Sequence, residues 1–229
     1  KGTFVSKTLI QCLSPSNGAG IVSVEVTTNG ADYSEDMVQY RYFASPAISH
    51  VIPSSGPTEG GTVVSVYGRN FVDSDTLYCR FGNSTSVLGR WISGDRIECT
   101  TPPMVAGDIV ISMTNNGVDY TTTNSTFMVL PESEVSKVSP TFGPVGTSTA
   151  VTVQGTGFVF SRSLYCRFGL SAVAAMYVNE TTVVCTAPDI PAGVINVTVS
   201  SNGVDYSSSK ATYEYVAAHH IQSILPRSG

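Results

Sequence analysis

The stretch that decides the fold is "GDIVISMTNNGVDY", residues 107–120, because its ending occurs three times in the chain. The last five residues match "NGADY" at residues 29–33 and "NGVDY" at residues 202–206, at steps of 87 and 86 residues. A fixed period of this length indicates a chain built from repeats. Other landmarks keep nearly the same step, and they are Cys12, Cys99 and Cys185; Cys79 and Cys166; and Pro53, Pro140 and Pro226.

Apolar and polar residues alternate before each copy of this turn phrase, as they do in a half-buried strand. We expect the alternate apolar residues to face a core, and these are Val22, Val24 and Val26; Ile109, Ile111 and Met113; and Ile195, Val197 and Val199. The Asn-Gly pair that follows predicts a hairpin turn, because both residues tolerate positive φ. A calcium site at Asp32, Asp119 or Asp205 is the other interpretation, but one carboxylate per turn is too few for a cation that takes six or more oxygens.

Strand signals dominate the rest of the repeat. Short β-branched or aromatic runs are separated by Gly, Pro, Asn and Asp, with no sustained helical period. Seven such runs in one repeat predict an immunoglobulin-like β-sandwich and therefore an all-β chain. The predicted strands of the first complete repeat are residues 48–52, 62–67, 77–81, 87–92, 96–100, 108–114 and 126–130.

The repeat also predicts the domain boundaries. We expect residues 1–44 to be the C-terminal part of one repeat, 45–131 and 132–217 to be complete repeats, and 218–229 to begin the next. The chain is then one window of a longer array. Predicted linkers of about four residues favour a semi-rigid rod over freely swinging domains, and they are residues 44–47, 131–134 and 217–220.

Two cysteines recur in each complete repeat, about twenty residues apart, and predict two disulfides, Cys79 with Cys99 and Cys166 with Cys185. Cys12 matches Cys99, so its partner is expected upstream of Lys1. Zinc binding is the competing interpretation, but zinc ligands normally come as closely spaced pairs with histidine, and no CxxC occurs. Paired cysteines predict an oxidising location, outside the cell or on the secretory route.

Composition narrows the function further. A formal net charge of -5 and a pI near 5.1 give no electrostatic basis for binding nucleic acid. Ser and Thr make up about a quarter of the chain, as in many secreted and cell-surface proteins that carry glycans. The longest apolar run, residues 172–178, is too short to cross a bilayer.

The motifs of one repeat run, in order, "ISHVIPSSGPTEGGTVVSVYGRNF", "LYCRFGN", "RIECTTPP", "GDIVISMTNNGVDY" and "STFMVL". This order resembles an IPT/TIG domain, and the resemblance covers the whole chain. The second complete repeat departs from it in having Gly146 without a second glycine, so its opening hairpin is expected to differ slightly while the other motifs are intact. For the fold, the resemblance implies tandem immunoglobulin-like sandwiches arranged end to end.

For function the resemblance implies less. Such domains occur in plexin and Met-type receptor stalks, in fibrocystin-like surface proteins, in protist and algal surface proteins, beside some polysaccharide-active enzymes, and in Rel-type transcription factors. The acidic charge and paired cysteines argue against the transcription factors.

No catalytic constellation is visible. None of His50, His219 and His220 recurs in the repeat, and the tandem pair is either a metal-binding pair or a solvated linker. Asp73 and Asp75 are replaced by Phe160 and Arg162 in the next copy, which favours a surface loop over a cation site. We therefore expect no enzyme activity, no cofactor and no metal.

Motifs for glycosylation are a more specific functional signal than the candidate catalytic or metal-binding residues. Four acceptor motifs for N-glycans occur, at Asn83, Asn124, Asn179 and Asn196. Asn196 is predicted to point outward from its strand, while Asn83 and Asn179 fall in connections. The O-glycan candidates, for which a plain polar turn is the other interpretation, are Thr121, Thr122, Thr123, Ser207, Ser208 and Ser209.

A Tyr and Arg pair recurs in "LYCRFG", as Tyr78 with Arg80 and Tyr165 with Arg167. Alternation with the inward cysteine predicts that these side chains point outward. Two interpretations are open. The pair forms a contact surface for a sugar or a neighbouring chain, or it supports the face of the sandwich.

The main functional hypothesis is a non-enzymatic segment of a long glycosylated extracellular rod or fibril, in a cell coat, wall or appendage. The alternative is the stalk of a cell-surface receptor or adhesin, and a weaker one is an accessory module of a polysaccharide-active enzyme. The expected partners are neighbouring repeats of the same chain, identical chains in a filament, and covalent glycans.

Overall fold

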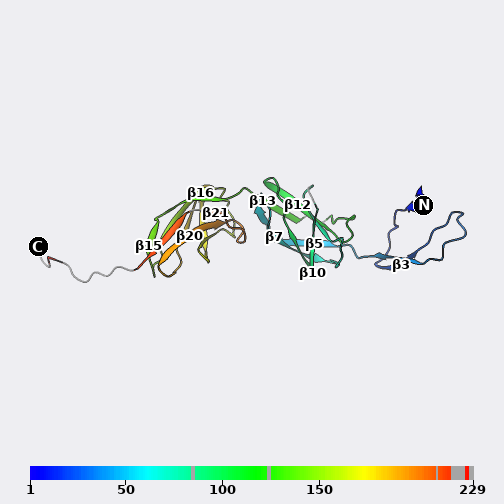
Figure 1. The fold of residues 1–229 in the computed structure, drawn as a ribbon, viewed down its shortest axis with the longest axis horizontal. Helices are drawn as coiled ribbons and strands as arrows, with labels where there is room; N and C mark the ends of the chain where they lie inside the picture. The colour runs from blue at the N-terminus through cyan, green and yellow to red at the C-terminus, as the bar shows by residue number, and fades with distance from the viewer. Residues whose placement is uncertain (84–85, 123–124, 210, 218–224, 227–229) are drawn as a thin grey trace. The chain divides into compact units, whose positions relative to one another are not determined.

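The computed structural model describes residues 1–229 except 84–85, 123–124, 210, 218–224 and 227–229. The described residues form strands and connections without a helix, so the all-β expectation is confirmed (Figure 1). In that part of the chain no helix is long and apolar enough to cross a membrane. The chain divides into two compact units, residues 1–46 and 47–229, which are described separately.

The first unit holds two ribbons of two strands each and no buried core. Strand β1 (Thr3–Ser6) pairs with β2 (Leu9–Gln11), and β3 (Gly20–Val24) pairs with β4 (Val38–Tyr42). Val24 and Val26 remain 46% and 42% exposed. Within residues 1–46 these valines are therefore not buried in a core.

The second unit holds two sandwiches, and the first comprises residues 47–130. A four-stranded sheet in the order β10-β11-β7-β5 packs on a five-stranded sheet in the order β6-β13-β12-β8-β9. All pairs are antiparallel except β6 with β13. The strands are β5 (Ala47–Ile52), β6 (Ser55–Pro57), β7 (Val63–Arg69), β8 (Tyr78–Phe81), β9 (Ser86–Leu88), β10 (Arg90–Ser93), β11 (Arg96–Thr100), β12 (Gly107–Thr114) and β13 (Ser125–Leu130).

One predicted strand is divided in this sandwich. Residues 87–92 do not form one strand, because the chain leaves the five-stranded sheet after β9 and joins the four-stranded sheet as β10. Gly89 lies at the crossing, where its N–H donates to the carbonyl of Leu77 at 2.8 Å. The short strand β6 was not predicted.

The second sandwich, residues 134–216, makes the same crossing without a break. The first half of β18 pairs with β17 and its second half with β19, so all nine strands form one continuous sheet that folds into two layers. Ala175 takes the place of Gly89 and donates to Leu164 at 3.0 Å. The strands are β14 (Glu134–Ser139), β15 (Phe142–Pro144), β16 (Ala150–Thr156), β17 (Tyr165–Phe168), β18 (Ser171–Asn179), β19 (Thr182–Thr186), β20 (Gly193–Ser200), β21 (Ser208–Ser209) and β22 (Thr212–Val216).

Each sandwich has its own core, built from the inward residues of both layers. Ile111 and Met113 are fully buried in the first core, and Val197 and Val199 in the second, as alternation predicts. Ile109 and Ile195 are only partly buried at the strand entrance. Burial of these apolar side chains is the main favourable term in the stability of each sandwich.

Candidate functional site

The turn phrase has the same internal hydrogen bonds in all three copies. In the third copy, the side-chain oxygen of Asn202 accepts from the N–H groups of Val204 and Asp205 at 3.0 and 2.8 Å. The amide of Asn202 donates to the Asp205 carboxylate at 2.6 Å. Asn29 and Asn116 make the equivalent bonds to Asp32 and Asp119. In each copy the aspartate carboxylate therefore accepts a hydrogen bond from the asparagine amide, and the asparagine closes the turn.

Positive φ occurs at the glycine of each turn phrase and not at its asparagine. Gly30, Gly117 and Gly203 have φ of 75°, 76° and 78°. Both residues of the Asn-Gly pair tolerate positive φ, but only the glycine adopts it in these turns. The asparagine side chain, rather than its backbone, shapes the turn, as in an Asx turn.

The hydroxyl group that directly follows each turn phrase also bonds to the backbone. Ser34, Thr121 and Ser207 each accept the N–H of the residue eight positions earlier, at 3.1, 3.2 and 3.1 Å. Two of these, Thr121 and Ser207, are predicted O-glycan positions. Both are partly buried, so a sugar on either oxygen would compete with this backbone contact.

The Tyr and Arg pairs pack against the turn. The Arg80 guanidinium lies 3.9 Å from the centre of the Tyr120 ring, and Arg167 lies 3.9 Å from that of Tyr206. Tyr78 and Tyr165 are half-buried, with ring carbons beside the turn glycines Gly117 and Gly203. This is an arrangement in which "LYCRFG" holds the turn phrase of its own sandwich in place.

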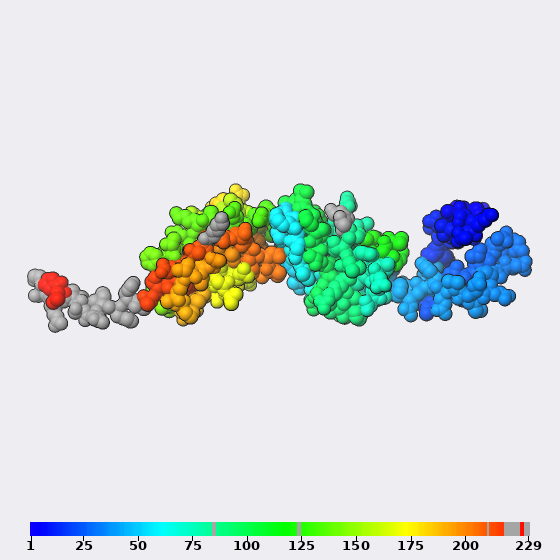
Figure 2. All heavy atoms as spheres, in the orientation of Figure 1, coloured from blue at the N-terminus to red at the C-terminus, as the bar shows by residue number. Residues whose placement is uncertain are grey.

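The third turn also contacts the neighbouring sandwich. The Asn202 amide donates to the carbonyl of Ser55 at 2.8 Å, and the Thr62 hydroxyl donates to the Asp205 carboxylate at 2.7 Å. The cyan segment near residue 55 and the orange segment near residue 205 meet at this place in Figure 2. Sequence analysis missed this contact and did not single out Thr62. The available signal was a threonine at the same position of the next repeat, Thr149.

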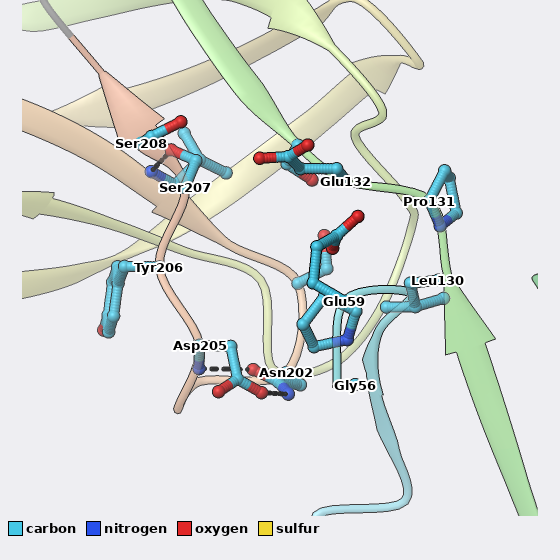
Figure 3. Close-up of a pocket in the computed structure, with 14 residues that line it drawn as sticks. Gly56, Glu59, Leu130, Pro131, Glu132, Asn202, Asp205, Tyr206, Ser207 and Ser208 are labelled. Atoms are coloured by element: carbon cyan, nitrogen blue, oxygen red, sulfur yellow. Dashed lines mark hydrogen bonds between the residues drawn. The ribbon is translucent and has the colours of Figure 1, made fainter. Parts of the chain in front are cut away.

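A cavity of about 290 Å³ lies beside this contact and is lined by both sandwiches. Figure 3 shows Gly56, Glu59 and Leu130 of the first sandwich around it, together with Asn202, Asp205 and Tyr206 of the second. A second hollow lies on the other side of the turn, between residues 51–55 and residues 161–163. Residues of the turn therefore line both the cavity and the second hollow.

The linker between the sandwiches is short and partly fixed. Strand β13 ends at Leu130 and β14 begins at Glu134, which leaves three residues between them. Leu130 is 7% exposed, and the Ser133 hydroxyl donates to the carbonyl of Gly157 at 2.8 Å. Three residues span at most about 11 Å, so the sandwiches stay close whatever else changes.

Each complete sandwich contains one disulfide that joins its two layers. Cys79 on β8 is bonded to Cys99 on β11, and Cys166 on β17 to Cys185 on β19. Cys12 is exposed and has no disulfide partner among the described residues.

Three of the four N-glycan acceptors lie in the described part of the chain. Asn83, Asn179 and Asn196 are all exposed. Asn179 accepts from the backbone and hydroxyl of Thr181, at 3.0 and 2.9 Å. Asn124 and the O-glycan candidate Thr123 lie outside the described residues. Thr122 and Ser208 are exposed, and Ser209 is partly buried.

Groups suited to catalysis or metal binding do not gather in the described residues. No cluster of three or more His, Cys, Asp or Glu side chains there could hold a metal ion. His50 stacks on Tyr67 with ring centres 4.7 Å apart, and Asp73 and Asp75 are exposed. His219 and His220 lie outside the described part.

A family model described as the IPT/TIG domain matches residues 46–129 and 133–215. The chain belongs to the IPT/TIG domain family. Among its relatives, mouse (Mus musculus) fibrocystin-L is 27% identical over 192 residues, which is 81% of this chain and 4% of that protein. Human (Homo sapiens) plexin-A3 is 24% identical over 198 residues, which is 82% of this chain and 10% of that protein. This IPT/TIG chain thus spans a tenth or less of these curated relatives.

The tandem fold also occurs in a solved structure. The full extracellular region of plexin A4, domains 1 to 10, covers 89% of this chain and 19% of its own length, with a TM-score of 0.52 and 20% identity. The two disulfides fit such an environment, because disulfides persist in oxidising compartments. This IPT/TIG segment is extracellular or exposed at the cell surface.

Proposed function

We propose that this chain is a segment of the stalk of a cell-surface receptor or adhesin, in which tandem IPT/TIG sandwiches act as a non-enzymatic spacer. The observation that carries the proposal is the junction between the two complete sandwiches. A three-residue linker and two hydrogen bonds between side chains and their partners across the junction hold neighbouring domains together. The likeness to plexin and fibrocystin-L regions supports the same role.

A stalk must hold a more distant domain at a defined distance from the membrane. Interfaces between domains of one chain ordinarily permit relative motion unless something restricts them. Here the short linker limits the separation, and the seated turn restricts the angle. The disulfide in each sandwich adds resistance to unfolding of the single unit.

The surface chemistry fits a spacer better than a catalyst. The described residues combine exposed hydroxyl and amide groups with few charges, and no cluster of three or more His, Cys, Asp or Glu side chains among them could hold a metal ion. N-glycans on Asn83, Asn179 and Asn196 would extend from exposed positions without disturbing either core. The partners we propose are the neighbouring repeats and these glycans.

The test is removal of residues 45–131, one whole repeat, from the full-length protein on cells. A spacer predicts that an N-terminal tag moves closer to the membrane by about the length of one sandwich, while surface expression persists. Interference microscopy of the tag measures this height. An unchanged height, or loss of an enzymatic activity specific to this repeat, would contradict the proposal.

A second candidate is a structural rod or fibril. It is favoured by the head-to-tail character of the junction, because a contact between different faces of successive units propagates without closing. Electron microscopy of the native material distinguishes the two. A filament with an axial repeat of one or two domains supports the fibril, and isolated rods ending at a membrane anchor support the stalk.

A further inference from the structure

The turn phrase of the first complete sandwich carries two unused hydrogen-bonding positions. The Asn116 amide donates one hydrogen to Asp119 at 2.8 Å. Its second hydrogen has no partner among the described residues, and the Asp119 carboxylate has none there beyond the bonds within the turn. In the third copy, these two positions are the ones that bond to Ser55 and Thr62.

The turns at residues 116–120 and 202–206 also differ in how far their side chains are buried. Asn116 and Asp119 are exposed, whereas Asn202 and Asp205 are partly buried by the neighbouring sandwich. Their internal hydrogen bonds are nevertheless equivalent. The turn is therefore formed by its own sandwich before any neighbour is seated on it, which lowers the entropy cost of docking.

The surface that receives the turn also recurs. We call residues 55–62 of the first sandwich the receiving phrase, and residues 142–149 of the second are its counterpart. In each, the threonine hydroxyl lies over a strand glycine that has no room for a side chain. A Cβ on Gly56 would lie 2.4 Å from the Thr62 oxygen, and one on Gly143 would lie 2.9 Å from the Thr149 oxygen.

The threonines occupy the same place in their sandwiches. The N–H of Thr101 donates to the Thr62 carbonyl at 2.9 Å, and the N–H of Ala187 donates to the Thr149 carbonyl at 2.8 Å. Thr149 is partly exposed, and its hydroxyl bonds only weakly within the described residues, to Thr147 at 3.4 Å. It is thus open to a partner that accepts a hydrogen bond.

From these observations we propose that the NGxDY turn is a docking element that fixes the angle between successive IPT/TIG repeats. Its asparagine and aspartate bind the receiving phrase of the repeat that precedes it. Asn116 and Asp119 accordingly bind a preceding repeat that offers a backbone carbonyl acceptor at the position of Ser55 and a threonine hydroxyl donor at the position of Thr62. Thr149 binds the turn of a repeat that follows. This inference rests on the proposed spacer role and supplies its mechanism.

The first experiment uses the two sandwiches as they stand in the chain. Spin labels on non-natural residues at exposed Leu88 and Leu170 report the distance between the sandwiches. Thr62→Val removes the donor, and Asp205→Ala removes the acceptor. Loss of about 1.4 kcal/mol corresponds to a tenfold change in equilibrium, so we expect the undocked population to rise about tenfold in each variant. The double variant should be no worse than Asp205→Ala alone, because that change already removes the bond to Thr62 as well as the bond to Asn202.

Two matched controls make this test specific. Thr149→Val and Asp119→Ala are the same chemical changes at the equivalent positions. Among the described residues, neither Thr149 nor Asp119 has a hydrogen bond to another sandwich. Both should leave the distance distribution unchanged, and comparable melting curves would show that each control and its partner variant remain folded. Equal, narrow distributions in all four variants would overturn the docking proposal.

The second experiment uses the full-length protein. There Asp119→Ala should increase bending at the junction that precedes residue 47, as measured by kink positions in single-molecule images. Unchanged bending would restrict docking to the Thr62–Asp205 junction and overturn the general rule. Either failure leaves the spacer test intact, because the height lost with residues 45–131 does not depend on how stiff a junction is.

Discussion

The guanidinium of Arg80 lies 3.9 Å from the ring centre of Tyr120, which joins two recurring motifs of one sandwich. Arg80 comes from "LYCRFG" and Tyr120 from "NGVDY", 40 residues later. The Tyr120 hydroxyl is 2.6 Å from that of Ser86, and Nε of Arg80 donates to Ser112 at 3.3 Å. The side chains that were open to two interpretations thus engage their own sandwich in this structure.

Replacing Arg80 with methionine should destabilise the first sandwich by about 1 kcal/mol. The change keeps an apolar stem but removes the cation from the ring, and such contacts contribute about 0.5–2 kcal/mol. Urea unfolding measures the free energy. Arg90→Met is the control, because Arg90 is exposed and pairs only with Glu98, and it should cost less than 0.5 kcal/mol. Equal effects of the two substitutions would argue against a role for the stack.

Gly68→Ala should destabilise the first sandwich by about 1–3 kcal/mol, since an added methyl overfills a packed site. A Cβ there would lie 2.0 Å from the carbonyl oxygen of Ala47, and the equivalent Gly155 meets Glu134 at 1.9 Å. Thermal unfolding followed by circular dichroism reports the loss. Gly94→Ala, whose Cβ would have its nearest neighbour at 3.9 Å, should be tolerated.

Stability of the second sandwich should fall above pH 10 because of Tyr215. Burial, with smaller contributions from Tyr213 and Asp189, raises the pKa of Tyr215 from 10.0 to about 12. The unfolded chain then loses its proton first. The free energy of unfolding that Tyr215 contributes is fully present below pH 10 and is lost as the pH rises towards 12. Tyr215→Phe should remove this part of the pH dependence, as measured by urea unfolding between pH 8 and 12.

At neutral pH the same substitution should be neutral or stabilising by about 1 kcal/mol. The Tyr215 hydroxyl is buried and has no hydrogen-bond partner among the described residues, so its removal relieves a desolvation cost. Tyr213→Phe, on the same strand, is the control and should keep most of the loss of stability above pH 10, because burial is the larger cause of the raised Tyr215 pKa. A variant Tyr215→Phe that still loses stability in that range would show that another group is responsible.

Removing the second disulfide by Cys166→Ala with Cys185→Ala should cost roughly 3 kcal/mol, since it frees a loop of 19 residues in the unfolded chain. The melting temperature of residues 132–217 should fall, and that of the first sandwich should not. Reduction of the wild type should lower both. Intact mass before and after reduction checks that the bonds form, and free Cys79 and Cys99 would overturn the pairing.

Secretion from a eukaryotic host should add N-glycans at Asn83, Asn179 and Asn196, because all three are exposed. Peptide mass spectrometry after enzymatic deglycosylation detects each site. Thr121 and Ser207 should stay unmodified, since each oxygen accepts a backbone hydrogen bond within its hairpin. A sugar on Thr121 with an unchanged melting temperature would contradict this assignment.

The fold could be predicted because its signals are local and recur. Alternation in "DIVISM" identifies β12, and the period aligns Cys79 with Cys166 and Cys99 with Cys185. The division of residues 87–92 into β9 and β10 could not be predicted, since both halves carry the same strand pattern and only the layers of the sandwich separate them. The site was less predictable. The turn phrase was recognised, but its contact partners lie elsewhere in the sequence.

The sequence by itself determined the repeat, the sandwich and the order of its motifs, because period, alternation and turn residues act over short distances along the chain. Only the tertiary structure decided what the turn does. Thr62 and Asp205 are 143 residues apart and carry no mutual signature, and their hydrogen bond forms only once two separately folded sandwiches are brought together by a three-residue linker. The same "NGVDY" contacts a neighbouring sandwich at residues 202–206 and makes no such hydrogen bond at residues 116–120 among the described residues, although the two phrases are identical.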